Sequence, residues 1–439
     1  MGIFAAGVIF ISPFVIAQHE KDLYIEGVVG THTLKKLPPE ILGYLSEGLI
    51  EIDSRGNPKP LIAQSIEVSE KGRVFTIKLK EDVYWHNGSL LTSQDLAYNL
   101  QEVQVEKPDS RTLIFKLKEP FSPFPTLLTN PLFKITRNDE VLGVGEYRII
   151  KAGYNKTQHL TELVLTSTTR SPKLIIVKFY PTESEAITAL KLGEIHGLRV
   201  SSLDSVKRWQ NLTIYKKIMP RQFLGIFVQM KDNIVGGKDP TLRQAMSAAL
   251  APVEDEKPFI GPYSDSSWAH LPFENKYAYN PDKAKEILSA FRKKAGMTED
   301  QNIGVKLTTF PRHQAIAQHI KSSWKAVGIN MEIEITPSRP EQFQLLLTEQ
   351  DLPSDPDQYN LWHSTQTATN ITNYSNLRVD KDLEDGRKTL DIEKRMEKYA
   401  DFQKIIREEL PVIYLHHTSS YYAIMKKYDR KDVRDLLGI

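Results

Sequence analysis

The sequence predicts an α/β protein with mixed sheets covered by helices, and two observations support this class. The chain has 439 residues, more than one hydrophobic core usually supports, so two or three domains are expected. Residues 305–309, 315–327 and 329–335 show strand, amphipathic-helix and strand patterns in succession. A strand–helix–strand unit of this kind predicts parallel strands in a helix-covered sheet.

The composition fits a soluble globular protein, with 40% hydrophobic and 26% charged residues. The 57 basic and 55 acidic side chains give a net charge of +2. Without a basic stripe or charge block, the sequence indicates no nucleic-acid binding. The absence of cysteine excludes a disulfide framework, thiolate metal sites and a cysteine nucleophile.

The N-terminal segment is uncharged and almost wholly apolar over residues 2–17. Its length suits the hydrophobic region of a signal peptide, and Val15-Ile16-Ala17 can serve as a cleavage site. A full membrane span needs about 20 residues. We therefore expect residues 1–20 to be a signal peptide or an N-terminal membrane anchor, and the rest to lie outside the cytoplasm, in the periplasm or at the cell surface.

In the first half of the chain, apolar spacing predicts a helix over Lys35–Ile52. The proline-rich segment Pro120–Pro131 predicts a rigid surface loop rather than a core element. After a strand at Leu174–Phe179, the capping box Thr182-Glu183-Ser184-Glu185 predicts a helix start, and Gly193 can close that helix.

In the second half, Phe223–Met230 reads as a buried strand, and Leu242–Leu250 has helical spacing. Asn280-Pro281 predicts the N-cap and first residue of a further helix. An amphipathic helix is expected over Asp391–Leu410, stopped by Pro411, and a strand over Val412–Leu415.

Residues 63–96 carry the most specific pattern of the chain. In order, they contain Ser65, Glu67 and Ser69, a turn at Gly72, a strand with Phe75, Ile77 and Leu79 on one face, Val83, Trp85-His86-Asn87-Gly88, and a helix start at Thr92–Asp95. This order resembles the family 5 extracytoplasmic solute-binding proteins that serve peptide and nickel ABC importers. Tyr180–Glu194 and Leu242–Met246 also resemble motifs of that family.

The resemblance implies a two-lobed, periplasmic-binding-protein-like type II fold. Lobe I would comprise residues 21–224 and 418–439, with a small inserted subdomain at about 50–134. Lobe II would comprise residues 225–417, and two chain crossings would form a hinge. The segment after Asp95 is shorter than in the family, which predicts a trimmed subdomain.

The resemblance places ligand recognition in the loop Glu349–Tyr374, where family members place an acidic side chain, beside an aromatic, against the ligand's α-amino group. Asp355-Pro356-Asp357-Gln358-Tyr359 and Trp362-His363-Ser364-Thr365-Gln366 resemble the D-P-D-x-Y-x-x-W-H-S-S-Q sequence of one branch of the family. The expected ligand-binding residues are Trp362, Asp351, Asp355, Asp357, Tyr359, His363, Asn370, Asn373 and Trp268.

Two features leave the individual roles open. The family's usual acidic position is Leu352 in this chain, so Asp351 or Glu349 becomes the candidate amine anchor. A core aromatic is the alternative interpretation of Trp362, and a turn cap before proline is the alternative for Asp355.

Catalytic and metal sites find little support in the sequence. No nucleophile elbow is present, and the serine and histidine positions lie in unrelated elements. His313 and His319 are six residues apart, whereas two ligands on one helical face need a spacing of four. His416 and His417 leave a strand on opposite sides. We expect no catalytic residue, no metal site and no cofactor, and a metal carried by the ligand stays open because the family includes nickel and haem binders.

The sequence therefore predicts a monomeric binding protein that captures peptides or a similar small polar solute between two hinged lobes and delivers it to an ABC permease. Two rivals remain: a surface peptide-binding or signalling module with the same fold, and a secreted hydrolase. Permease and ATPase genes beside this one would favour the importer, and their absence would favour the first rival. Cleavage of peptides by the protein would favour the hydrolase.

Overall fold

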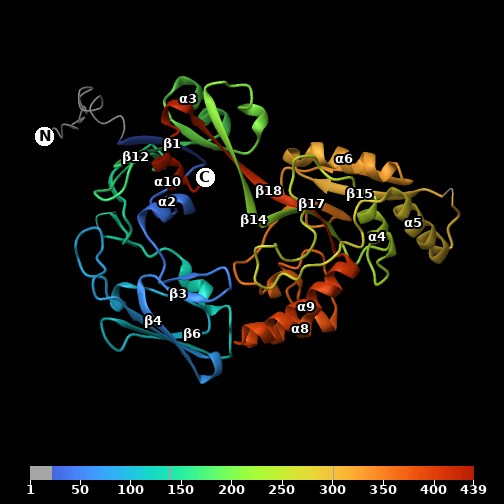
Figure 1. Ribbon diagram of the computed structural model, residues 1–439, viewed down its shortest axis with the longest axis horizontal. Helices are drawn as coiled ribbons and strands as arrows, with labels where there is room; N and C mark the ends of the chain where they lie inside the picture. The colour runs from blue at the N-terminus through green and yellow to red at the C-terminus, as the bar shows by residue number, and fades with distance from the viewer. Residues whose placement is uncertain (1–21, 137, 139, 300) are drawn as a thin grey trace.

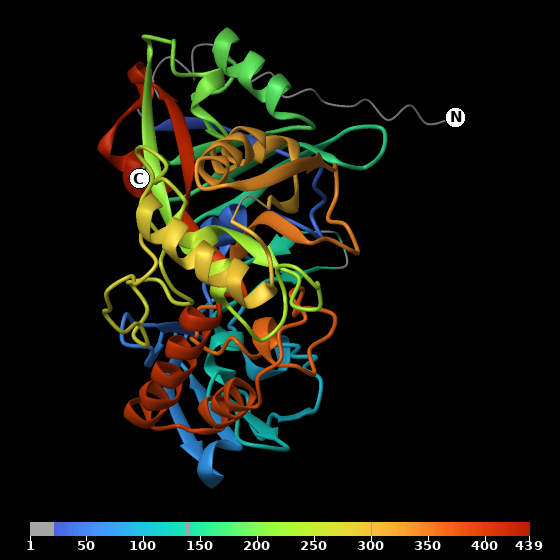
Figure 2. The ribbon, with the colours of Figure 1, turned by 90° about the vertical axis from the view of Figure 1, so that its right-hand side faces the viewer.

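The computed structural model describes residues 22–136, 138, 140–299 and 301–439. Figure 1 shows two bodies, lobe I and lobe II, joined by the long strands β14 (Leu212–Val228) and β18 (Val412–Met425). Lobe II lies in front of lobe I in Figure 2. The predicted signal peptide or anchor, residues 1–20, lies outside the described residues.

One mixed sheet of ten strands runs through both lobes. In spatial order its strands are β10 (Arg148–Tyr154), β11 (Leu160–Thr166), β12 (Leu174–Tyr180), β1 (Leu23–Val29), β13 (Gly197–Val200), β18, β14, β17 (Leu345–Asp351), β15 (Ile303–Thr309) and β16 (Ile329–Ile335). The pairs β1–β12 and β15–β16 are parallel, whereas β14 pairs antiparallel with both β17 and β18. The predicted mixed α/β class is confirmed.

The crossing strands are longer than the sequence predicts. β14 and β18 pair from Leu212↔Met425 to Phe227↔Val412, whereas only Phe223–Met230 and Val412–Leu415 were expected. Their middle portions contain Lys216, Lys217 and polar residues 418–420, which are exposed or half-buried. Such residues show no apolar alternation, so only pairing with the other strand identifies them as strand.

A separate sheet builds the inserted subdomain of lobe I. It consists of β4 (Ala63–Ser69), β5 (Val74–Leu79), β7 (Thr112–Leu117) and β6 (Val103–Glu106), beside the hairpins β2 (Ile50–Ile52)–β3 (Pro58–Pro60) and β8 (Lys134–Ile135)–β9 (Val141–Leu142). The expectation of a surface loop over Pro120–Pro131 is wrong. The 3-10 helix η3 (Phe124–Thr129) buries Phe124 completely, with ring centroids 4.6 Å from Phe75 and 5.2 Å from Phe115.

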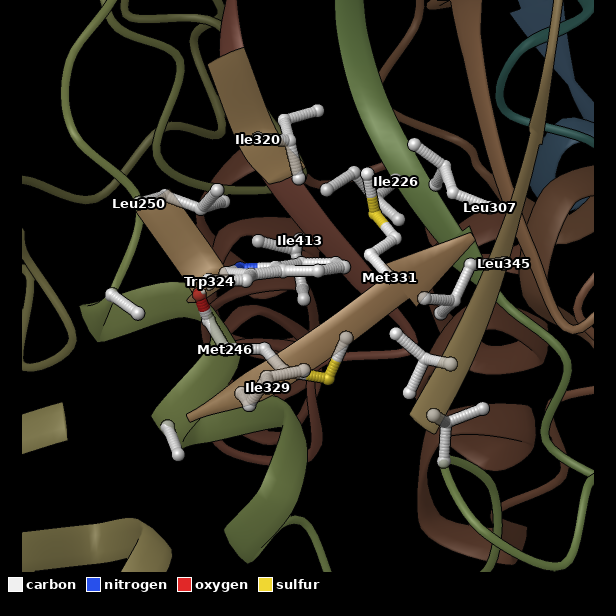
Figure 3. Close-up of a cluster of buried hydrophobic side chains, with 14 of the residues drawn as sticks. Ile226, Met246, Leu250, Leu307, Ile320, Trp324, Ile329, Met331, Leu345 and Ile413 are labelled. Carbon is white, nitrogen blue, oxygen red and sulfur yellow. Dashed lines mark hydrogen bonds between the residues drawn. The ribbon is translucent and has the colours of Figure 1, made fainter. Parts of the chain in front are cut away.

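The strand–helix–strand unit of lobe II is confirmed as β15, α6 (Gln314–Lys325) and β16. Figure 3 shows its core, in which Trp324 lies among Met246, Leu250, Ile329 and Ile413. Trp324 is fully buried, and its Nε1–H donates to the carbonyl of Met246 at 2.9 Å. Burying an indole requires such a partner for its one polar atom.

The remaining helices complete the two lobes. They are α2 (Pro39–Leu45), α3 (Glu183–Leu192), α4 (Thr241–Ala248), α5 (Pro281–Ala295), α7 (Tyr359–Trp362), α8 (Leu377–Lys388), α9 (Ile392–Glu409) and α10 (Lys431–Leu437), with 3-10 turns η1 (Glu70–Gly72), η2 (Ser93–Asp95), η4 (Leu203–Ser205), η5 (Pro311–His313) and η6 (Lys426–Tyr428). Both predicted caps are confirmed, since Thr182 accepts from the amide of Glu185 and Asn280 from that of Lys283.

Of the helix expected over Lys35–Ile52, only Pro39–Leu45 is helical, so the prediction is wrong at both ends. α2 ends at Leu45, and β2 begins at Ile50. Between them the chain runs against residues 128–129: Leu49 donates to the carbonyl of Leu128 at 3.0 Å, and a Cβ on Gly48 would lie 2.4 Å from the carbonyl oxygen of Thr129. This close tertiary approach, absent from the apolar pattern, ends the helix.

Candidate functional site: the cleft between the lobes

A cavity of about 1000 Å³ lies between the two lobes. Lobe I contributes the end of β1, the start of α3 and residues 199–204, and lobe II contributes the turn between β15 and α6 and the end of β17. The crossing strands β14 and β18 supply Leu224, His416 and residues 418–421. Small-molecule ligands commonly bind in concave sites of this volume between domains.

The lobe I wall of the cleft is acidic. It carries Glu26, Glu40 and Glu183, together with the cation Arg199. Glu26 is 5% exposed and accepts hydrogen bonds from the hydroxyls of Tyr44 at 3.0 Å and Tyr422 at 3.3 Å. Burial raises the pKa of Glu26 to about 7, and these tyrosine bonds only partly offset that rise. This carboxyl therefore titrates near neutral pH.

On the lobe II wall, Arg312 and Glu349 compensate each other's charge, with Nη2 and Oε2 3.3 Å apart. His313 is buried beside them, and burial with the positive charge of Arg312 lowers its pKa to about 4. Its ring is thus neutral at pH 7, so its 3.5 Å approach to Glu349 is not an ion pair. Arg312 Nε instead donates to His313 Nε2 at 3.1 Å.

The crossing strands offer small polar groups to the cleft. Thr418 and Ser419 line it, Thr418 donating to Gln222 and Ser419 to Glu256. His416 also lines it, and its buried Nε2 makes no hydrogen bond within the part of the chain that the structure describes. His417 faces away and stacks edge-on against Phe259, as expected for adjacent strand positions.

Most of the predicted ligand residues have partners inside lobe II. Trp362 is 3% exposed, and its Nε1–H donates to Gln358 at 2.7 Å. Asp355 pairs with buried Arg395, whose Nη1 lies 3.0 Å from Oδ2. Asp357 pairs with Arg387 at 2.8 Å, and burial raises the pKa of Asp357 against the effect of that cation.

The other predicted polar residues are similarly engaged. Asn370 donates to the carbonyl of Tyr374 at 2.8 Å, and Asn373 to the side chain of Gln229 at 3.1 Å. The ring of His363 stacks on that of Tyr359, with centroids 4.1 Å apart. None of these four predicted residues lines the 1000 Å³ cavity.

Asp351 and Trp268 differ from the other predicted residues in their surroundings. Asp351 stands on the same face of β17 as Glu349, two residues away, and accepts from Gln222 at 2.8 Å. Trp268 lines a smaller cavity of about 90 Å³, together with Ser54 of the inserted subdomain and Arg221 of β14. Of these two predicted residues, Trp268 borders the smaller cavity, and Asp351 lines neither of the two cavities.

Sequence reasoning missed several cleft residues that left a signal. Glu26 is an acidic residue within the otherwise apolar strand Leu23–Val29, and buried carboxyls are rare without a special role. Arg312 follows the carboxyl end of the predicted strand 305–309, where ligands of α/β sheets bind. His416 left no such signal, because only the pairing of β18 with β14 sets its direction.

Within the described residues, no group of three or more histidine or acidic side chains is placed to hold a metal ion. His319 lies on α6 and contacts the carbonyl of Ala251 at 2.9 Å through Nε2. Likewise, no helix of the described chain combines the length and apolar character needed to cross a membrane.

Comparison with known sequences identifies one family. The model described as bacterial extracellular solute-binding proteins, family 5 Middle, matches residues 57–104 and 96–373. The oligopeptide-binding protein AppA of Bacillus subtilis (strain 168) is 24% identical over 486 aligned residues, covering 91% of this chain and 86% of AppA.

Solved structures share the same architecture. B. subtilis AppA in complex with a nonapeptide has a TM-score of 0.66 at 21% identity, covering 94% of this chain and 97% of AppA. NikZ from Campylobacter jejuni in complex with Ni(L-His) has a TM-score of 0.70 at 20% identity, covering 92% of this chain and 94% of NikZ. These matches establish the two-lobed binding-protein fold.

Proposed function

The chain belongs to the bacterial extracellular solute-binding proteins of family 5, and from this membership we propose that it captures a peptide or a similar small polar solute and delivers it to the permease of an ABC importer. The relatives are substrate-binding proteins rather than enzymes. We infer the same extracytoplasmic location, with residues 1–20 as a signal peptide or anchor, and a monomeric state. The lobe boundaries at 224/225 and 417/418 fit the crossings of β14 and β18.

The observation that carries the proposal is the 1000 Å³ cleft, because both lobes and both crossing strands line it. Two strands are the covalent links across which lobes can swing and close over a ligand, a motion known from periplasmic binding proteins. The walls alternate carboxylates, guanidinium groups and hydroxyls. Such walls suit a ligand with its own charges and backbone polar groups.

A metal chelate is a second ligand class that one observation favours. His416 presents a buried Nε2 without a hydrogen-bond partner in the described chain, and it lines the cleft near His313. Since no three metal-ligating side chains meet among the described residues, a metal would have to arrive with most of its ligands already bound. NikZ, one of the similar structures, holds Ni(L-His).

Native mass spectrometry of the protein purified from cells tests the proposal directly. We expect an adduct with the mass of a peptide or another small solute, lost on unfolding and restored by titration. Ser420→Trp, which fills the cleft from β18, should abolish the adduct. Ser375→Trp, at an exposed position away from the cleft, should retain it. Equal retention by both variants contradicts capture in this cleft.

A further inference from the structure

The lobes touch at a second place, remote in sequence from the crossing strands. The loop after β7 in the inserted subdomain meets the end of α8 in lobe II, as Figure 1 shows at the lower edge of the molecule. Ser122 donates its backbone N–H to the carbonyl of Arg387 at 2.8 Å and its hydroxyl to the same oxygen at 3.0 Å. Lys388 Nζ lies 2.8 Å from Glu119 Oε2.

The contact uses groups that a helix end leaves available. The last carbonyl oxygens of α8 have no hydrogen-bond partner within the helix. Ser122 of the opposite lobe donates to the carbonyl oxygen of Arg387. The Ser122 hydroxyl oxygen also lies 3.3 Å from the carbonyl oxygen of Gly386. A Cβ on Gly72 would come within 2.9 Å of Leu390, so the chain after α8 also packs closely against η1 of the subdomain.

The predicted ligand motif 355–359 holds this helix end in place. Asp357 pairs with Arg387, whose guanidinium lies 3.9 Å from the ring centroid of Tyr359 and 5.1 Å from that of Phe121 in the opposite lobe. Asp355 orients Arg395, whose Nε donates to the carbonyl of Gly386 at 3.0 Å. Two buried carboxylates thus fix the two residues that Ser122 contacts.

We propose that residues 386–390 form a latch that joins lobe II to the inserted subdomain and limits how far the cleft opens, and that Asp355 and Asp357 are positioning residues for it. Lobes linked by two strands alone would swing about them. Hydrogen bonds and an ion pair made in one state only shift the population toward that state. The latch does not depend on the identity of the ligand and is measurable in the ligand-free protein.

The test measures the separation of the lobes. Because the chain has no cysteine, Glu67→Cys on β4 and Glu397→Cys on α9 give two spin-labelling sites at exposed positions without background. Pulsed electron–electron double resonance then reports the distribution of distances between the two spin labels. In Glu119→Lys, which opposes Lys388 with a like charge, the more open population should rise about two- to five-fold, as for a partly exposed ion pair.

The controls isolate the contact itself. Glu119→Lys combined with Lys388→Glu restores the opposite charges and should return the distribution to that of the parent. Lys118→Glu breaks a similarly exposed pair with Glu102, at 2.9 Å within the same subdomain, and should leave the distribution unchanged. An unchanged distribution in Glu119→Lys overturns the proposal, as does equal widening in Lys118→Glu.

Asp357→Asn tests the positioning role. It removes the charge that holds Arg387, so the open population should rise as in Glu119→Lys, while Trp362→Phe, which disturbs the same core, should leave the lobe distance unchanged. A lower melting temperature of Asp357→Asn with the parent distance distribution overturns the positioning role. If Asp357→Asn does not fold, Asp357→Glu replaces it, because it keeps the charge and moves it outward. The open population should then rise by a smaller factor.

Discussion

Side chains that the sequence marks as ligand contacts and side chains that the structure gives to the cleft are largely different sets. Trp362, Asp355 and Asp357 are held by partners within lobe II. Glu26, His313 and His416 reach the cavity between the lobes. A contact of the first set with ligand stays a prediction, and each residue can be tested separately.

Trp362→Ala should reduce the free energy of unfolding by about 3–5 kcal/mol, the usual cost of removing a buried large aromatic side chain. Ligand affinity should stay unchanged, because the ring packs among lobe II side chains. Urea unfolding and calorimetric titration measure the two quantities. Trp362→Phe, which loses mainly the bond to Gln358, should cost less. Weakened binding at unchanged stability would instead show that the ring contacts ligand.

Glu26 should make stability depend on pH in an unusual direction. Burial raises its folded pKa from 4.5 to about 7, so the folded protein binds this proton more tightly than the unfolded chain. The contribution of this proton to the free energy of unfolding is complete below pH 4.5 and is lost as pH rises toward 7. Glu26→Gln, neutral throughout, should therefore gain up to about 3 kcal/mol over wild type above neutral pH.

Denaturant unfolding of wild type and Glu26→Gln at several pH values between 4 and 8 checks this expectation. The difference in unfolding free energy should be small at the acid end and grow with pH. A difference that shrinks as pH rises would contradict the assigned pKa direction. Glu162→Gln, a control on β11 at a half-buried carboxyl that pairs with Lys151, should show no such trend.

Among the elements, those with strong local signals were predictable and those that depend on distant partners were not. The N-caps Thr182 and Asn280 and the unit β15–α6–β16 follow from residues adjacent in sequence. The full length of β14 and β18 follows only from their mutual pairing. Helix α8 has few apolar residues, and only Val379 and Leu383 of them are buried, so the sequence offers few apolar positions from which to predict it.

Asn280→Ala should lower the free energy of unfolding by about 1 kcal/mol, because the amide of Lys283 at the start of α5 loses its acceptor. Thermal unfolding measures the change. Asn280→Ser keeps a capping oxygen and should retain most of the stability. Equal losses in both variants would show that the side chain acts through something other than the cap.

For the whole molecule, the two lobes enclose the 1000 Å³ polar cleft, and they contact each other at the crossing strands and at the end of α8. Domain closure of this kind turns a solvent-exposed binding surface into a buried one, which strengthens each polar contact with the ligand.

Ligand should therefore stabilise the whole protein. At a free ligand concentration of about 100 times Kd, mass action predicts about 2.7 kcal/mol of added stability. Differential scanning calorimetry with the solute identified by mass spectrometry checks this value, and small-angle scattering should show a smaller radius of gyration. Ser420→Trp should show neither change, and a stabilised Ser420→Trp would place the ligand elsewhere.

The sequence by itself determined the family, the α/β class and the capped helices, because ordered motifs and short-range periodicity are local properties of the chain. Tertiary structure alone decided which side chains border the cleft. Glu26, Arg312 and His416 lie almost 400 positions apart at the extremes, and strand pairing across the ten-stranded sheet brings them together. The same packing closes partners around Asp355 and Asp357, and no local pattern records those partners.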